Sequence, residues 1–258
     1  IEITGSTEID AILVKNIHSG QSSSNPSGLT LFQESLLFSS DNGKKGIELW
    51  QSKGTKQTTS LLKDINPGQG SSTPSGFTPF GRHLYFAADD GSTGRELWRT
   101  NGTRQGTIQV IDLREGALSS SPTDLAVLDS SLLFGANDGT NGSELWGLTE
   151  GQTTPSLIRD INPNTGSQPK ELTTYQKGIY FSAEGPLYGR ELWVTDGTEE
   201  GTRLALDINP GGFNSNPKDL TVFGNDLYFT AETYTSGRQL WVSNGTTGGT
   251  TAMSALTD

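Results

Sequence analysis

Three acidic side chains recur at one position of a repeated pattern and could do chemistry together. Asp124, Glu171 and Asp219 each precede a leucine at the start of a short apolar run, whereas Gly28 and Gly76 stand at this position in the first two copies. Carboxylates gathered at one mouth of a channel could hold Ca²⁺, or act as the acid and base that cleave a glycoside. The alternative is that a neighbouring lysine neutralises two of them and all three are solvated surface acids.

A repeated tryptophan motif supplies a second set of candidate side chains. It reads Glu-Leu-Trp in four copies and Gln-Leu-Trp in the fifth, and an arginine precedes it at Arg95, Arg190 and Arg238. We count these arginines as candidate ligand-binding residues, and the tryptophans could stack on sugar rings. The structural alternative is that the rings pack blades together, while the glutamate accepts hydrogen bonds from a neighbouring loop or pairs with the arginine. Gln239 in the fifth copy favours this alternative, because glutamine keeps the acceptor and loses the charge.

Few other residues could carry a catalytic or metal site. His18 and His83 are the two histidines, and we place them at opposite ends of the fold, which argues against a Ser-His-Asp triad and a histidine zinc site. The sequence has no cysteine, which excludes thiolate catalysis and disulfides. A further set of repeated aspartates lacks EF-hand spacing and is interpreted as turn residues: Asp64, Asp112, Asp160 and Asp207.

The charge balance limits the class of partner. The formal net charge is -11 at pH 7, with a pI of about 4.6, so we expect no nucleic-acid partner and no attraction to an anionic membrane surface. No apolar run approaches the roughly 18 residues that span a membrane, so we expect no membrane insertion. No signal peptide is visible at Ile1, which suggests that an export signal is absent or already removed.

The elements that must position these side chains follow from a fivefold repeat. The five tryptophans are spaced by 48, 48, 47 and 48 residues: Trp50, Trp98, Trp146, Trp193 and Trp241. Each unit contains four apolar bursts of strand length, bounded by Gly, Pro, Asn or Asp. In the second unit they cover Ser60–Ile65, Gly76–Phe80, His83–Ala87 and Glu96–Thr100. Residues 1–258 are therefore predicted to form one all-β domain, a five-bladed β-propeller with four antiparallel strands per blade and about 48 residues per repeat.

Closure of the ring needs a strand from one end of the chain. Ala11–Ile17 has the pattern of a good outer strand, whereas the corresponding last segment, Thr250–Leu256, is a poor one. An unpaired sheet edge is a liability. We therefore predict that Ala11–Ile17 is the N-terminal strand that closes the last blade, by pairing with Arg238–Ser243.

Two of the copies resemble a known repeat family. Glu191–Thr202 reads ELWVTDGTEEGT and Leu97–Thr107 reads LWRTNGTRQGT, which resemble the ELWxxDGT repeat family over essentially the whole chain. The first and third copies depart from the pattern, with QSKGT at Gln51–Thr55 and GLTEG at Gly147–Gly151. The resemblance implies a bacterial protein that is extracellular, on the cell surface or periplasmic. In blade number and repeat length the chain is also similar to five-bladed tachylectin-type lectins.

Five similar units favour binding over catalysis, because they create several equivalent grooves and no single catalytic centre. We expect a non-catalytic module that binds a glycan or a protein surface, as a monomer or as part of a larger assembly, with no cofactor other than Ca²⁺. The alternatives are a glycosidase that uses the carboxylates at the channel mouth and a purely structural module.

Overall fold

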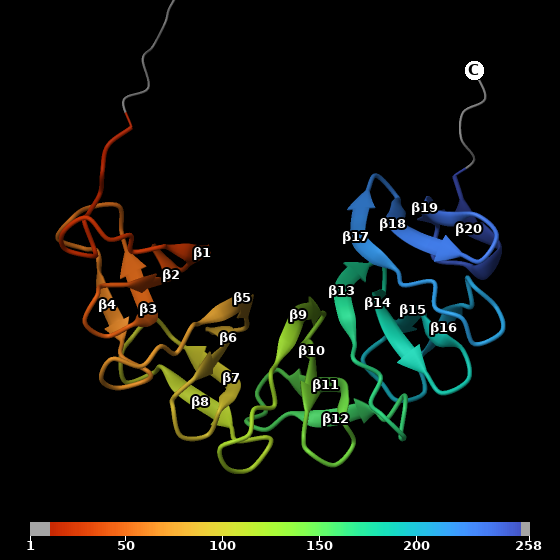
Figure 1. Ribbon diagram of the computed structural model, residues 1–258, viewed down its shortest axis with the longest axis horizontal. Helices are drawn as coiled ribbons and strands as arrows, with labels where there is room; N and C mark the ends of the chain where they lie inside the picture. Colours follow the sequence, from red (N-terminus) through yellow and green to blue (C-terminus); the bar gives the residue numbers. More distant parts are fainter. Residues whose placement is uncertain (1–10, 254–258) are drawn as a thin grey trace, which may run out of the picture.

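The computed structural model describes residues 11–253 and confirms the predicted propeller blades. Five separate sheets of four antiparallel strands follow one another along an arc, and the innermost strand of each contacts that of the next (Figure 1). Blade 1 contains β1 (Ser27–Phe32), β2 (Ser35–Asp41), β3 (Ile47–Ser52) and β4 (Ser60–Lys63). Blade 2 contains β5 (Ser75–Phe80), β6 (His83–Asp89), β7 (Arg95–Thr100) and β8 (Ile108–Ile111), and blade 3 contains β9 (Thr123–Leu128), β10 (Ser131–Asn137), β11 (Ser143–Thr149) and β12 (Ser156–Arg159). Blade 4 contains β13 (Lys170–Tyr175), β14 (Gly178–Gly185), β15 (Gly189–Thr195) and β16 (Arg203–Leu206), and blade 5 contains β17 (Lys218–Phe223), β18 (Asp226–Thr233), β19 (Gly237–Ser243), the short 3-10 helix η1 (Thr247–Gly249) and β20 (Thr250–Ala252).

Each blade has two faces with different side chains. In blade 3, Phe134 lies opposite Trp146 on the neighbouring strand, so both occupy one face, and Leu145 occupies the other. The same register joins a phenylalanine to the tryptophan in the other four blades. We call the two sides of a blade its tryptophan face and its leucine face. Both faces are apolar, which explains why the apolar pattern is denser than simple alternation.

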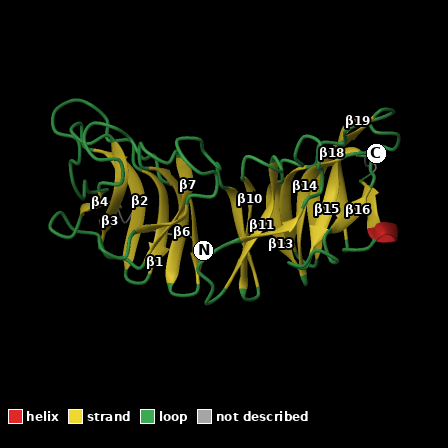
Figure 2. Ribbon diagram, turned by 90° about the horizontal axis from the view of Figure 1, so that it is seen from below, coloured by secondary structure: helices red, strands yellow, loops and turns green. Residues whose placement is uncertain are grey.

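The hydrophobic core lies between the blades. The leucine face of each blade packs on the tryptophan face of the next, as Tyr85 and Leu97 of blade 2 pack with Phe134 and Trp146 of blade 3. Equivalent clusters join the other successive blades. The stacked sheets, seen edge-on in Figure 2, are therefore stabilised mainly by nearest-neighbour contacts.

The predicted closure by the N-terminal segment is wrong. Residues 11–17 form no strand, and β19 pairs instead with β20, where Trp241 lies opposite Ala252. A tight turn joins β19 to β20, so this pairing closes only a short loop and costs little chain entropy. Figure 1 shows blades 1 and 5 on either side of an open gap in the arc. The described residues contain no helix long and apolar enough to cross a membrane.

Candidate functional site

The three predicted carboxylates stand at a repeat position that has an unusual backbone conformation. Asp124, Glu171 and Asp219 have φ values of 52°, 62° and 58°, and Gly28 and Gly76 have 66° and 70°. Each lies where the pairing of the innermost strand with its neighbour shifts register. All five copies therefore adopt the left-handed conformation, for which glycine is the least strained residue. Gly28 and Gly76 meet this constraint without strain, whereas the three acids adopt the same conformation at a cost in backbone energy.

The carboxylates connect successive blades and do not gather at one point. Asp124 Oδ1 accepts a hydrogen bond from the backbone N–H of Glu171 at 3.2 Å, and Glu171 Oε2 accepts one from the N–H of Asp219 at 2.9 Å. Within residues 11–253 no three acidic or histidine side chains are placed to hold a metal ion together. The geometry thus gives no support to the predicted three-carboxylate Ca²⁺ site, because Asp124 and Glu171 each bond to the backbone of the next blade and Asp219 accepts from the Thr230 hydroxyl of its own blade.

The three arginines predicted to bind a ligand contact the backbone of the fold. The guanidinium of Arg95 donates to the carbonyl oxygen of Thr73 at 2.9 Å, Arg190 donates to that of Gln168 at 3.0 Å, and Arg238 to that of Asn216 at 3.1 Å. Each acceptor residue has a φ between 46° and 48° and directly precedes a proline. The arginines therefore hold an unfavourable backbone turn at the entrance to their blade.

The tryptophans are packing residues. The exposed fractions of Trp50, Trp98, Trp146 and Trp193 are 5%, 7%, 8% and 6%, and Trp241 is half-buried and stacked on Phe229, with ring centroids 6.3 Å apart. A ring that stacks on a sugar must present a free face to solvent. The four buried rings leave no such face, and Trp241 stacks one face on Phe229, so the geometry favours packing over a sugar platform.

The repeated glutamate joins its blade to the loop that enters the next blade. Glu144 accepts hydrogen bonds from the backbone N–H groups of Ile161, Asn162 and Ser167 at 3.1, 3.1 and 2.7 Å, and from the Ser167 hydroxyl at 2.5 Å. Glu48, Glu96 and Glu191 accept from the equivalent loops. The predicted role of the glutamate as a hydrogen-bond acceptor is confirmed, and its donors are backbone N–H groups and a serine hydroxyl of the neighbouring loop. The alternative prediction, an ion pair between the glutamate and the arginine, is wrong.

These glutamates make the stability of the fold depend on pH. Burial raises the pKa of all four, and it raises the pKa of Glu191 to about 7 against an ordinary 4.5. Between these values the folded chain binds a proton that the unfolded chain has released. The stabilisation is therefore present in full below about pH 4.5 and is lost as the pH rises through about 7.

We expect the melting temperature to fall by roughly several degrees between pH 5 and pH 8. Differential scanning calorimetry across this range measures the effect. The variant Glu191→Gln should be less stable throughout, because its amide N–H₂ faces backbone donors, but its melting temperature should change less with pH. A melting temperature that rises from pH 5 to pH 8 would contradict the expected sign.

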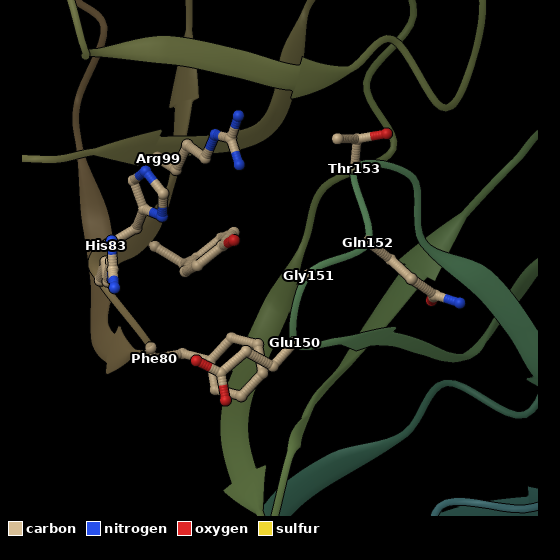
Figure 3. A pocket seen from close by; sticks show the side chains of 10 residues that line it. Phe80, His83, Arg99, Glu150, Gly151, Gln152 and Thr153 are labelled. Atoms are coloured by element: carbon tan, nitrogen blue, oxygen red, sulfur yellow. The ribbon is translucent and has the colours of Figure 1, made fainter.

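A charged and aromatic groove lies between blades 2 and 3. It has a volume of about 330 Å³ and is lined from the turn between β5 and β6, from β6 and β7, and from the loop between β11 and β12. Figure 3 shows His83 and Arg99 on one side and the loop with Glu150 and Gln152 on the other. Tyr85 forms the base of a small aromatic cluster, with its ring centroid 5.9 Å from that of Phe80 and 6.2 Å from that of His83.

The blade 3 side of the groove departs from the repeat pattern, whereas a similar groove between blades 4 and 5 is lined by a regular Asn-Gly-Thr loop. In blade 2 the Asn-Gly-Thr loop is closed by its own hydrogen bonds, in which Asn101 Oδ1 accepts from the N–H and hydroxyl of Thr103. In blade 3 a simple turn replaces it, with the N–H of Gln152 donating to the Thr149 carbonyl at 3.0 Å. Glu150 is thereby exposed beside the neighbouring blade. The sequence signal that could have located this groove is the departure GLTEG, which we noted without assigning a role.

The groove combines charged, aromatic and amide side chains that can bind a ligand. It carries cations on the blade 2 side, Arg82 and Arg99, and an anion on the blade 3 side, Glu150. Burial, with a smaller contribution from the charge of Arg99, lowers the pKa of His83 below its ordinary value. His83 is therefore neutral at pH 7 and can donate or accept a hydrogen bond. The lining contains no serine or cysteine.

Comparison with known proteins gives the fold and corrects the predicted function. No family model and no curated protein matches the sequence. Similar solved structures include a puromycin hydrolase (15% identity, TM-score 0.59), a Mycobacterium tuberculosis puromycin-hydrolyzing peptidase (12%, 0.56) and a structure from an analysis of two prolyl endopeptidases (14%, 0.58). The matches cover 93%, 88% and 88% of this chain, but the chain spans only 39%, 37% and 34% of theirs. The chain has the fold of a peptidase propeller.

These neighbours contradict the expected carbohydrate-binding or protein-interaction module, and equally the glycosidase alternative, since the matched propellers are parts of peptidases. At such low identity they show the fold alone. The resemblance to the ELWxxDGT repeat family, and the bacterial location that it implies, stay predictions.

Proposed function

We propose that this chain is the non-catalytic propeller part of a peptidase, and that the groove between blades 2 and 3 receives a short peptide. The observation that carries the proposal is that the groove is lined by charges of both signs, Arg82 and Arg99 from blade 2 and Glu150 from blade 3, beside the aromatic rings of Phe80 and Tyr85. The fold neighbours support the reaction class, because their propellers belong to peptidases.

The chemistry of the groove matches the two ends of a peptide. The guanidinium groups of Arg82 and Arg99 can pair with a carboxylate in a bidentate manner, and Glu150 can accept from an ammonium group. Tyr85 and Phe80 offer an apolar contact between these charges. The volume of about 330 Å³ lies at the lower end of the range for small-ligand sites, which favours a peptide of two or three residues.

Isothermal titration calorimetry with the tripeptide Ala-Pro-Phe, free at both ends, tests the proposal. We expect a dissociation constant between roughly 10 µM and 1 mM, and about tenfold weaker binding by Arg99→Gln, because a charge-assisted hydrogen bond contributes about 1.5 kcal/mol or more. Amidation of the peptide carboxylate should weaken binding by the wild type to a similar extent. Mass spectrometry should find the peptide intact, because the proposal assigns this groove a binding role and no catalytic one.

Arg104→Gln is the matched control, because it removes the same charge from an exposed loop of the same blade. It should bind the tripeptide like the wild type. A specific site in this groove would be contradicted if no binding occurred at 10 mM peptide, which is roughly tenfold above the weakest expected dissociation constant. Equal weakening of binding by the two arginine variants would contradict it as well.

A further inference from the structure

A second cavity lies at the junction between blades 3 and 4 and has a volume of about 400 Å³. It is lined by the loop that enters blade 3, by the facing ends of β10 and β11, and by the loop that enters blade 4. The cavity shares no lining residue with the groove between blades 2 and 3. It is therefore a separate place in the fold, and no motif of the sequence analysis pointed to it.

The cavity occupies the space that an arginine fills in other blades. In blade 2 the guanidinium of Arg95 donates to the carbonyl oxygen of Thr73 at 2.9 Å. Blade 3 has Ser143 at the arginine position and Ser121 at the position of the acceptor, and both residues line the cavity. A serine side chain is too short to fill the space of a guanidinium group, so this space is open in blade 3.

The partner of the arginine has changed together with it. In the three blades that have the arginine, the residue opposite it on the neighbouring strand is acidic: Asp89, Glu184 and Glu232. In blade 3, Asn137 lies opposite Ser143. Blade 3 has thus lost one positive and one negative charge from this place, and a neutral amide and a hydroxyl stand there instead.

Two cations line the cavity from the loops on either side. Arg114 stands where the equivalent loops of other blades have an asparagine: Asn66, Asn162 and Asn209. Lys170 stands at the first position of its blade, where Thr123 stands one junction earlier. The lining contains no acidic side chain, and the ion pairs among residues 11–253 involve neither cation. The cavity is therefore positive in a chain whose net charge is -11.

The polar side chains of the cavity have unused hydrogen-bond donors. In the described part of the chain, the side chains of Arg114, Lys170, Ser121 and Ser143 make no hydrogen bond. Asn137 uses only its Oδ1, which accepts from the N–H of Gly139 at 2.7 Å, so its amide N–H₂ is free to donate. A phosphate monoester matches this set, because it carries a charge of about −1.5 to −2 at pH 7 and three strong acceptor oxygens. A carboxylate has one charge and two oxygens and would leave more of these donors unused.

We propose that the cavity between blades 3 and 4 binds the phosphate group of a small phosphate monoester. Arg114 and Lys170 pair with its charge, and the amide of Asn137 and the hydroxyl of Ser143 donate to its oxygens. The volume of about 400 Å³ lies within the range of small-ligand sites and leaves room for the esterified group. The inference is independent of the peptide groove.

A ¹H–¹⁵N NMR titration of the 258-residue chain with glycerol 3-phosphate tests the proposal. We expect saturable shifts of the backbone amides around the cavity, with a dissociation constant of roughly 0.1–1 mM. Lys170→Gln and Arg114→Gln should each weaken binding roughly three- to tenfold, because each removes a charge-assisted contact. Asn137→Asp, which restores the acid of the other blades, should weaken binding at least as much. All three side chains are at least partly exposed, so the variants should keep the fold, which circular dichroism checks.

Lys218→Gln is the matched control. Lys218 stands at the position of Lys170 one junction further on, where Arg190 fills the space and donates to the Gln168 carbonyl. This variant should bind glycerol 3-phosphate like the wild type. Equal weakening by Lys170→Gln and Lys218→Gln would overturn the proposal, because it would show a response to net charge alone. Absence of shifts at roughly 10 mM ligand, about tenfold above the weakest expected constant, would overturn it too.

Two further titrations fix the chemistry and the place of the site. Acetate should bind roughly tenfold or more weakly than glycerol 3-phosphate, and equally tight binding of acetate would overturn the assignment to a phosphate group. Arg99→Gln, which alters the groove between blades 2 and 3, should bind glycerol 3-phosphate like the wild type. Weakening by Arg99→Gln would place the phosphate in that groove and overturn the cavity between blades 3 and 4 as its site.

Discussion

Replacement of Glu144 by alanine is expected to lower the free energy of unfolding by about 4–6 kcal/mol. The change removes the acceptor of four hydrogen bonds that join blade 3 to the loop entering blade 4. Each buried donor left without a partner costs about 1–3 kcal/mol. The loss should exceed that of an ordinary surface change because Glu144 is 0% exposed. Denaturant unfolding followed by tryptophan fluorescence measures the difference.

Gln239→Ala is the matched control for this effect. Gln239 occupies the same position of its blade but is exposed, and its side chain donates one hydrogen bond to a loop carbonyl. The substitution should change the free energy of unfolding by no more than about 0.5 kcal/mol. Equal effects of the two substitutions would show that the glutamate does not stabilise the junction between blades.

Trp146→Ala is expected to cost about 3–5 kcal/mol, as large-to-small changes in a packed core do. The ring is 8% exposed and packs with Phe134 against Tyr85 and Leu97 of blade 2. Its removal leaves a cavity at the junction that the two rigid sheets cannot close. The midpoint of chemical denaturation should fall while the far-ultraviolet circular dichroism of the native state persists.

Tyr234→Ala controls for the loss of an aromatic ring as such. Tyr234 is 85% exposed on the loop after β18, so its removal should leave the unfolding midpoint nearly unchanged. A wild-type midpoint for Trp146→Ala would show that the tryptophan does not contribute to packing between blades.

The repeat spacing was sufficient to predict the blades. The tryptophans recur at intervals of 47 or 48 residues, and four short apolar bursts accompany each of them. Strand identity depends on such local patterns, and a residue period of two assigns Trp146 and Leu145 to opposite faces. The acceptor role of the repeated glutamate was also predicted from the sequence, although Gln239, the residue used to argue for it, is exposed and only donates a hydrogen bond in the structure.

The predictions that failed concern contacts between distant segments. Ala11–Ile17 has the better strand pattern, yet β20 pairs with β19 because a short loop connects them. The common left-handed φ of Asp124 and its counterparts cannot be read from residue type, since glycine and acids both occur there. Likewise, Arg95 precedes its glutamate in sequence but donates to the carbonyl of Thr73, which only the folded blade brings within reach.

The sequence by itself therefore determined the local architecture: the number of blades, the strands within them and the apolar character of both faces. These properties depend on residue period and turn chemistry within one unit of about 48 residues. Only the tertiary structure decided how the units meet, because packing between blades sets which side chains are covered. It brought Glu150 of blade 3 and Arg99 of blade 2 into one groove, and it left Phe223 and Leu29 exposed at the two ends of the arc while their counterparts inside it lie between packed sheets.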